Sequence, residues 1–131
     1  MIQKIRCLRD RWGICQTDIE KNAEVDAIIK IAGKNKKTYI MAIGAITNIA
    51  LAIKMAPQII NSIEIIWLGG HSLLQKNNLE YNFEQDTEAV KTVFDSKVNL
   101  TVIPCDNVAS NLVTSIYELE HYLKNKGELC E

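Results

Sequence analysis

Apolar residues along the chain alternate between runs of strand length and stretches with a helical repeat. The runs are rich in β-branched and aromatic side chains, which predict strands, and they cover residues 38–43, 62–68 and 99–104. Apolar positions three and four residues apart predict amphipathic helices, at about residues 21–32, 46–55, 86–96 and 108–126. Strands that alternate with helices imply right-handed βαβ crossovers. The pattern therefore predicts an α/β fold of three layers, with a mainly parallel sheet and flanking helices.

Three segments of this pattern carry more specific expectations. The strand at residues 38–43 has few polar side chains, which is typical of a strand covered on both faces. Residues 69–85 contain two glycines, three asparagines and no periodicity, so we expect a loop long enough to line a site. The helix at residues 108–126 has the clearest apolar stripe. The stripe consists of Leu112, Val113, Ile116, Leu119 and Leu123.

Small and polar residues follow the carboxyl end of each predicted strand. They are residues 43–48 after the first strand, residues 69–71 after the second and residues 104–106 after the third. Ligands of open α/β sheets bind in the crevice at the carboxyl ends of the strands. We therefore expect these loops to form one shared site.

Composition and charge exclude several classes of function. The 131 residues include 15 basic and 16 acidic side chains, a net charge of −1, which gives no electrostatic basis for binding nucleic acid or an acidic membrane. The length predicts a single domain. The apolar runs are too short to span a membrane, no secretory segment opens the chain, and the four cysteines match no metal-binding spacing. We interpret the cysteines as free thiols and expect a cytoplasmic protein.

Some residues near the loops have plain structural explanations. Gly44, Thr47 and Asn48 fit a strand-to-helix turn with capping. Asp86 fits a helix N-cap better than a ligand. Trp67, like Trp12 and His121, fits a packing or surface position. None of these residues requires a chemical role.

Other residues near the loops admit a chemical interpretation as well as a structural one. His71 follows two glycines at a strand end and is a candidate acid for a leaving group. Cys105 has no identifiable base nearby, so we interpret it as a strand-end thiol rather than a nucleophile. Taken alone, Glu80 and Asn82 fit a polar loop.

Four short motifs follow one another along the centre of the chain. They are Ala42-Ile43-Gly44-Ala45-Ile46-Thr47-Asn48-Ile49-Ala50-Leu51-Ala52, Trp67-Leu68-Gly69-Gly70, Glu80-Tyr81-Asn82-Phe83 and Asp86-Thr87-Glu88-Ala89-Val90. In order and spacing the chain resembles the inosine-uridine preferring nucleoside hydrolase family, whose members read G-P-L-T-N-I-A, M-G-G, E-F-N and D-P-E-A-A. The resemblance covers residues 38–113 and implies one partial, Rossmann-like domain of that family over residues 1–131.

The resemblance also implies a reaction and a set of site residues. The family hydrolyses the N-glycosidic bond of a ribonucleoside to base and ribose, with calcium holding the ribose hydroxyls and the attacking water. By their match to the motifs, Ile43 offers its backbone carbonyl to calcium, and Glu80 and Asn82 bind ribose. Asn78 is the candidate for a further ribose-binding asparagine, with Asn77 as the alternative. A ribonucleoside or ribose is therefore the expected ligand.

Both ends of the family's metal site lack a match in this chain. The opening D-x-D-x-G-x-D-D signature, which supplies calcium ligands and the general base, has no counterpart, since Asp10, Asp18 and Asp26 are widely spaced. No counterpart of the carboxyl-terminal calcium aspartate precedes Glu131. We therefore expect the isolated chain to bind calcium weakly, if at all, and to be inactive. As its protein partner we expect a second copy, in a homo-oligomer, or a complementing chain. The alternative is a non-catalytic remnant or interaction module that keeps the α/β scaffold.

Overall fold

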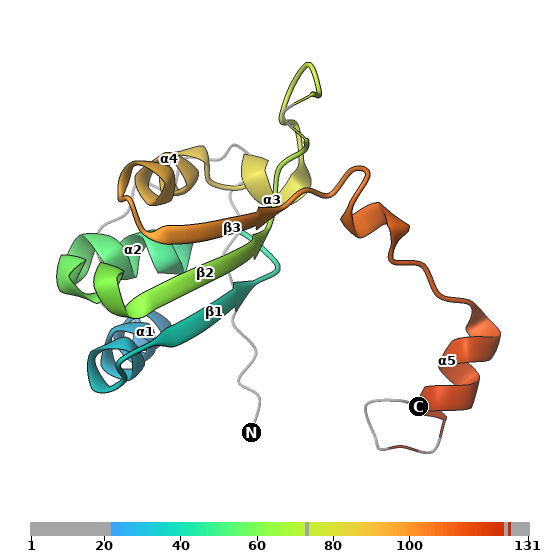
Figure 1. The fold of residues 1–131 in the computed structure, drawn as a ribbon, viewed down its shortest axis with the longest axis horizontal. Helices are drawn as coiled ribbons and strands as arrows, with labels where there is room; N and C mark the ends of the chain where they lie inside the picture. Colours follow the sequence, from blue (N-terminus) through green and yellow to red (C-terminus); the bar gives the residue numbers. More distant parts are fainter. Residues whose placement is uncertain (1–21, 73, 125, 127–131) are drawn as a thin grey trace.

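The computed structural model describes residues 22–72, 74–124 and 126 (Figure 1). Within these residues the chain forms a parallel sheet of β1 (Thr38–Ala42), β2 (Ile63–Leu68) and β3 (Asn99–Ile103), in the order β1-β2-β3. The helices are α1 (Ala23–Lys34), α2 (Thr47–Met55), α3 (Tyr81–Glu84), α4 (Thr87–Asp95) and α5 (Ile116–Leu123), with 3-10 helices η1 (Pro57–Ser62) and η2 (Ala109–Asn111). The predicted α/β class, with a parallel sheet flanked by helices, is confirmed.

The strand register brings the ends of the three strands to one edge of the sheet. Ala42 pairs with Trp67, and Leu68 pairs with Ile103. The loops that follow the strands therefore begin side by side, as the sequence predicts.

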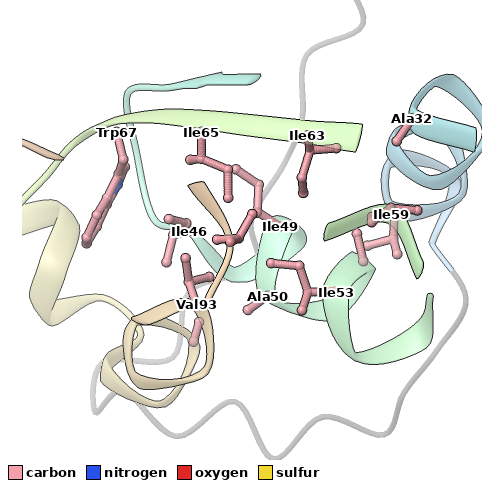
Figure 2. Packing of buried hydrophobic residues seen from close by; sticks show 14 of the residues in the cluster. Ala32, Ile46, Ile49, Ala50, Ile53, Ile59, Ile63, Ile65, Trp67 and Val93 are labelled. Carbon is pink, nitrogen blue, oxygen red and sulfur yellow. The ribbon is translucent and has the colours of Figure 1, made fainter. Parts of the chain in front are cut away.

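The hydrophobic core lies between the sheet and α1, α2 and α4 (Figure 2). Ile63, Ile65 and Trp67 alternate along β2 and point toward the helices, and Ile65 and Trp67 are fully buried. Ile49 and Val93 meet them from α2 and α4. This alternation arises because successive side chains of a strand point to opposite faces.

The opposite face of the sheet is open in the described part of the chain. Tyr39 and Met41 of β1 are 59% and 77% exposed. The expectation that the first strand is covered on both faces is therefore not met among these residues. The few polar residues of β1 reflect its β-branched and aromatic content rather than cover from two helical layers.

The last predicted helix is wrong over its first half. Residues 108–115 form η2 and an irregular segment, and α5 begins only at Ile116. Ser115 caps α5 through a capping box, in which its hydroxyl accepts from Glu118 N and the Glu118 carboxylate accepts from Ser115 N. The apolar stripe is also not buried, since Leu112 is 91% exposed and Leu119 is 45% exposed. Figure 1 shows α5 well away from the sheet.

Other element boundaries differ less from the expected ones. The first helix begins at Ala23, after Asn22 as N-cap, and extends to Lys34. The expected loop at residues 69–85 contains the short helix α3, which periodicity does not detect because it has only four residues. Among the described helices, none is long and apolar enough to cross a membrane.

Candidate functional site

The buried carboxylate of Glu80 organises the loop after β2. Its Oε2 accepts hydrogen bonds from Gly70 N at 2.8 Å and Phe83 N at 3.1 Å, and its Oε1 accepts from Asn82 N at 3.1 Å. The side chain is 6% exposed. Three backbone N–H donors satisfy a carboxylate that would otherwise be costly to bury. Glu80 therefore caps α3 and fastens it to the end of β2.

The two asparagines matched to ribose binding lie in the same loop. Asn82 Nδ2 donates to Leu68 O at 2.9 Å, and Asn78 Oδ1 accepts from His71 N at 2.9 Å. Both contacts tie the loop back to the carboxyl end of β2. The structure thus brings Asn78, Glu80 and Asn82 together at one strand end, and their ribose-binding role stays a prediction.

Glycine is required at positions 69 and 70 for two different reasons, close packing at Gly69 and backbone conformation at Gly70. A Cβ at Gly69 would lie 2.4 Å from the indole ring of Trp67, and Gly70 has φ +71°, a left-handed conformation that favours glycine. The Trp67 ring stacks on Phe83 with 6.0 Å between ring centroids. Trp67 Nε1 also donates to Gly44 O at 2.9 Å, which joins the loop after β1 to the end of β2 itself. The interpretation of Trp67 as a packing residue is confirmed.

A second long-range contact joins the first residue of α2 to the N-cap residue of α4. Thr47 Oγ1 donates to Asp86 Oδ2 at 2.7 Å, and Asp86 Oδ1 accepts from Ala89 N at 2.9 Å. The prediction that Asp86 is a helix N-cap is confirmed. The capping explanation of Thr47 and Asn48 is wrong, because Ile46 occupies the N-cap position of α2 and makes no side-chain cap. Thr47 instead bonds across 39 residues to the start of α4.

Calcium does not fit the described residues. Ile43 follows β1 with its side chain 80% exposed. No group of three or more His, Cys, Asp or Glu side chains among the described residues could hold a metal ion. Calcium requires six to eight oxygen ligands, so the Ile43 carbonyl cannot hold it alone. Asp26 lies on α1, whereas Asp10 and Asp18 lie outside the described residues.

The loop after β3 is hydrogen-bonded to the loop after β2. Cys105 N donates to Gly70 O at 2.9 Å, and Gln75 Nε2 donates to Asp106 Oδ2. Cys105 has a free thiol, whereas Cys7, Cys15 and Cys130 lie outside the described residues. The loop after β3 is therefore bonded to the loop after β2, and the loop after β1 is bonded to β2 itself.

A cavity of about 680 Å³ opens beside these loops, between β2, β3 and α4. The residues that line it include the polar His71 and Asn78 and the aromatic Trp67 and Phe83. Within the described residues, His71 Nδ1 is shielded from solvent and has no hydrogen-bond partner. The role of His71 as a leaving-group acid stays a prediction.

Glu80 has a structural role that the sequence pattern does not reveal. Its hydrogen bond to Gly70 crosses ten residues, and Glu is not among the preferred N-cap residues. The only available signal was the match of Glu80-Tyr81-Asn82 to a known motif.

Comparison with known proteins places this geometry in a family. Residues 8–130 match the model for "Inosine-uridine preferring nucleoside hydrolase", a longer match than the predicted 38–113. The chain is 36% identical over 77 residues to a "Probable ribonucleoside hydrolase" of Dictyostelium discoideum, covering 56% of this chain and 22% of that protein. It is 28% identical over 104 residues to an "Inosine-uridine preferring nucleoside hydrolase" of Leishmania major, covering 76% of this chain and 33% of that protein.

Solved structures give the same result for the fold. An inosine-uridine preferring nucleoside hydrolase from Bacillus anthracis superposes with a TM-score of 0.62 at 22% identity, covering 76% of this chain and 36% of that chain. A purine-preferring ribonucleoside hydrolase from Gardnerella vaginalis superposes with a TM-score of 0.58 at 33% identity, covering 66% of this chain and 29% of that chain. The chain thus spans between 22% and 36% of the length of these relatives. It belongs to the inosine-uridine preferring nucleoside hydrolase family.

Proposed function

We propose that this chain binds the ribose of a ribonucleoside at the carboxyl edge of its sheet and does not hydrolyse the nucleoside by itself. The observation that supports this proposal is the buried Glu80 carboxylate, bonded to three backbone N–H groups of the loop, with two asparagine side chains held at the same strand end. Family membership supplies the ligand class.

The chemistry of these groups suits a sugar. An ionised carboxylate offers about four lone-pair positions, so Glu80 keeps one beyond its three backbone partners. Among the described residues, Asn82 Oδ1 has no partner, and Asn78 keeps its amide N–H groups. Acceptors and donors fixed by a rigid loop are what orientation of vicinal hydroxyls requires.

Hydrolysis needs groups that the described residues do not bring together. In the family reaction, a water molecule is deprotonated by an aspartate and attacks the anomeric carbon. The strand-end loops contain one aspartate, Asp106, besides the helix cap Asp86, and Asp106 is engaged by Gln75 and Asn107. Loss of a general base alone costs roughly 10²–10⁴ in rate. We therefore expect no turnover unless carboxylates come from outside the described residues or from another chain.

The test combines a binding and a turnover measurement. Isothermal titration of inosine and uridine should give heat that Asn82→Ala abolishes, while Asn99→Ala at the opposite edge of the sheet leaves it unchanged. Ribose release should stay at background, with calcium and with a chelator. Chelator-sensitive release would contradict the expected inactivity, and absence of heat would contradict ribose binding.

A second candidate function is an interaction module that retains only the scaffold. The exposed apolar side chains of β1, Met41 at 77% and Tyr39 at 59%, favour it because monomeric soluble domains rarely leave such faces open. This candidate predicts a folded chain with no heat of nucleoside binding, so the same titration decides between the two.

A further inference from the structure

An apolar groove lies between β3 and α4, at the outer edge of the sheet. It is part of the 680 Å³ cavity, and we define it by four of the apolar residues that line this cavity, Val90, Phe94, Val102 and Pro104. Phe94 is 52% exposed although it faces this groove. Lys91 stands beside it and brings a positive charge to the rim. Within the described residues no strand pairs with the outer edge of β3, so the β3–α4 groove is accessible from that side.

Helix α5 has an apolar stripe without a partner in the described structure. Ile116 is 73% exposed, Leu119 is 45% exposed and Leu123 is 43% exposed. Isolated helices shorter than about 12–15 residues are marginal in water, and most helical stability comes from packing of an apolar face. The eight residues of α5 therefore need a surface to pack against, although the capping box fixes where the helix begins.

The segment before α5 leads it away from the groove of its own chain. Cys105 N is bonded to Gly70 O, Ala109 N to Pro104 O and Ser110 N to Cys105 O. Asn107 has φ 63° and its N–H donates to Ser110 Oγ, which fixes the turn into η2. Figure 1 shows the chain leaving β3, passing η2 and carrying α5 away from the α4 side of the sheet. These hydrogen bonds hold the segment on a course that carries α5 away from the groove of its own chain.

We propose that α5 of one copy packs into the β3–α4 groove of a second copy, and that the second copy returns the contact. Two reciprocal contacts of one kind close a two-fold dimer without leaving a free groove. Charge favours the pairing, because α5 presents Glu118 and Glu120 and the groove presents Lys91. This inference does not rest on ribose binding, since it is argued from the apolar residues of the β3–α4 groove and from α5.

The experiment compares full-length variants by sedimentation velocity. Phe94→Asp places a carboxylate in the groove, and Leu119→Asp places one in the stripe, so each should raise the Kd of the dimer about a hundredfold. Ile31→Asp is the control for Phe94→Asp, because Ile31 is also 52% exposed but lies on α1. His121→Asp is the control for Leu119→Asp, because His121 lies on the opposite side of α5. Both controls should leave the dimer intact, and circular dichroism verifies that each variant is folded.

A mixture of the two disrupting variants distinguishes exchange from other contacts. Phe94→Asp keeps an intact α5 and Leu119→Asp keeps an intact groove, so a heterodimer has one undamaged contact. Because two carboxylates in the other contact are not additive, equal amounts should associate more tightly than either variant alone. A monomeric wild-type chain would overturn the proposal. So would a dimer whose Kd neither variant changes, or a mixture that associates no more tightly than the separate variants.

Discussion

Gly69 leaves the space that the indole ring of Trp67 occupies. A Cβ at this position would lie 2.4 Å from two ring carbons, and Trp67 cannot move because its ring is fully buried and its Nε1 is bonded to Gly44 O. At the residue scale, the strand-end site thus depends on one missing side chain as much as on the polar groups around it.

Gly69→Ala should destabilise the protein by about 1–3 kcal/mol, as expected for overpacking in a rigid site. Gly33→Ala is the matched control, because a Cβ at Gly33 meets nothing within 4 Å and Gly33 lies inside α1. That substitution should stabilise the helix by roughly 0.5–1 kcal/mol. Urea denaturation measures both free energies of unfolding, and equal effects would show that Trp67 yields to the added methyl group.

At the scale of elements, α5 is defined by its first turn rather than by its stripe. The pKa of Glu118 is lowered by the hydrogen bond from Ser115 N, and further by the hydroxyls of Thr114 and Ser115. The ionised carboxylate is therefore favoured in the helix over the unfolded segment. Its contribution is present above the ordinary glutamate pKa and is lost as pH falls through the lowered value.

Acidification should consequently unwind the first turn of α5. Carbon chemical shifts of residues 116–123, followed from neutral pH to well below about 4.3, should report the loss. Glu118→Gln should remove this pH dependence, whereas Glu120→Gln, also exposed on α5, should retain it. A helix whose shifts do not change in the wild-type chain would contradict the role assigned to the capping box.

The comparison of prediction with structure also belongs to this scale. The strands, α2, α4 and the Asp86 cap were predictable because each is specified by a local pattern of side chains. Helix α3 was not, because it depends on the bond from Gly70 N to Glu80, across a loop without periodicity. The start of α5 was missed because periodicity continues through Leu112 and Val113, whereas the Ser115 box decides where the helix begins.

At the scale of the whole molecule, the core is one-sided. Ile65 is fully buried under α2, whereas Met41 on the other face is 77% exposed. Sequence patterns cannot distinguish these two faces, since both carry apolar residues. What covers a face depends on segments distant in the chain or on another molecule.

A one-sided core predicts unequal effects of truncation on the two faces. Ile65→Ala should cost about 2–5 kcal/mol, and Met41→Ala should change stability by no more than about 0.5 kcal/mol. Thermal or urea denaturation of the two variants gives the comparison. A large loss in Met41→Ala would mean that the open face is covered in solution.

The buried indole of Trp67 has a practical consequence for the study of this chain. The sequence contains two tryptophans, so replacing Trp12 by phenylalanine leaves Trp67 as the single tryptophan, and its ring lies against Gly69, Phe83 and the Gly44 carbonyl. Indole emission depends on solvent access and on the bond at Nε1. A ligand or partner that displaces Gly69, Gly70 or the Gly44 carbonyl would thus shift the emission maximum of Trp67. This tryptophan is therefore an intrinsic fluorescent probe of the strand-end loops.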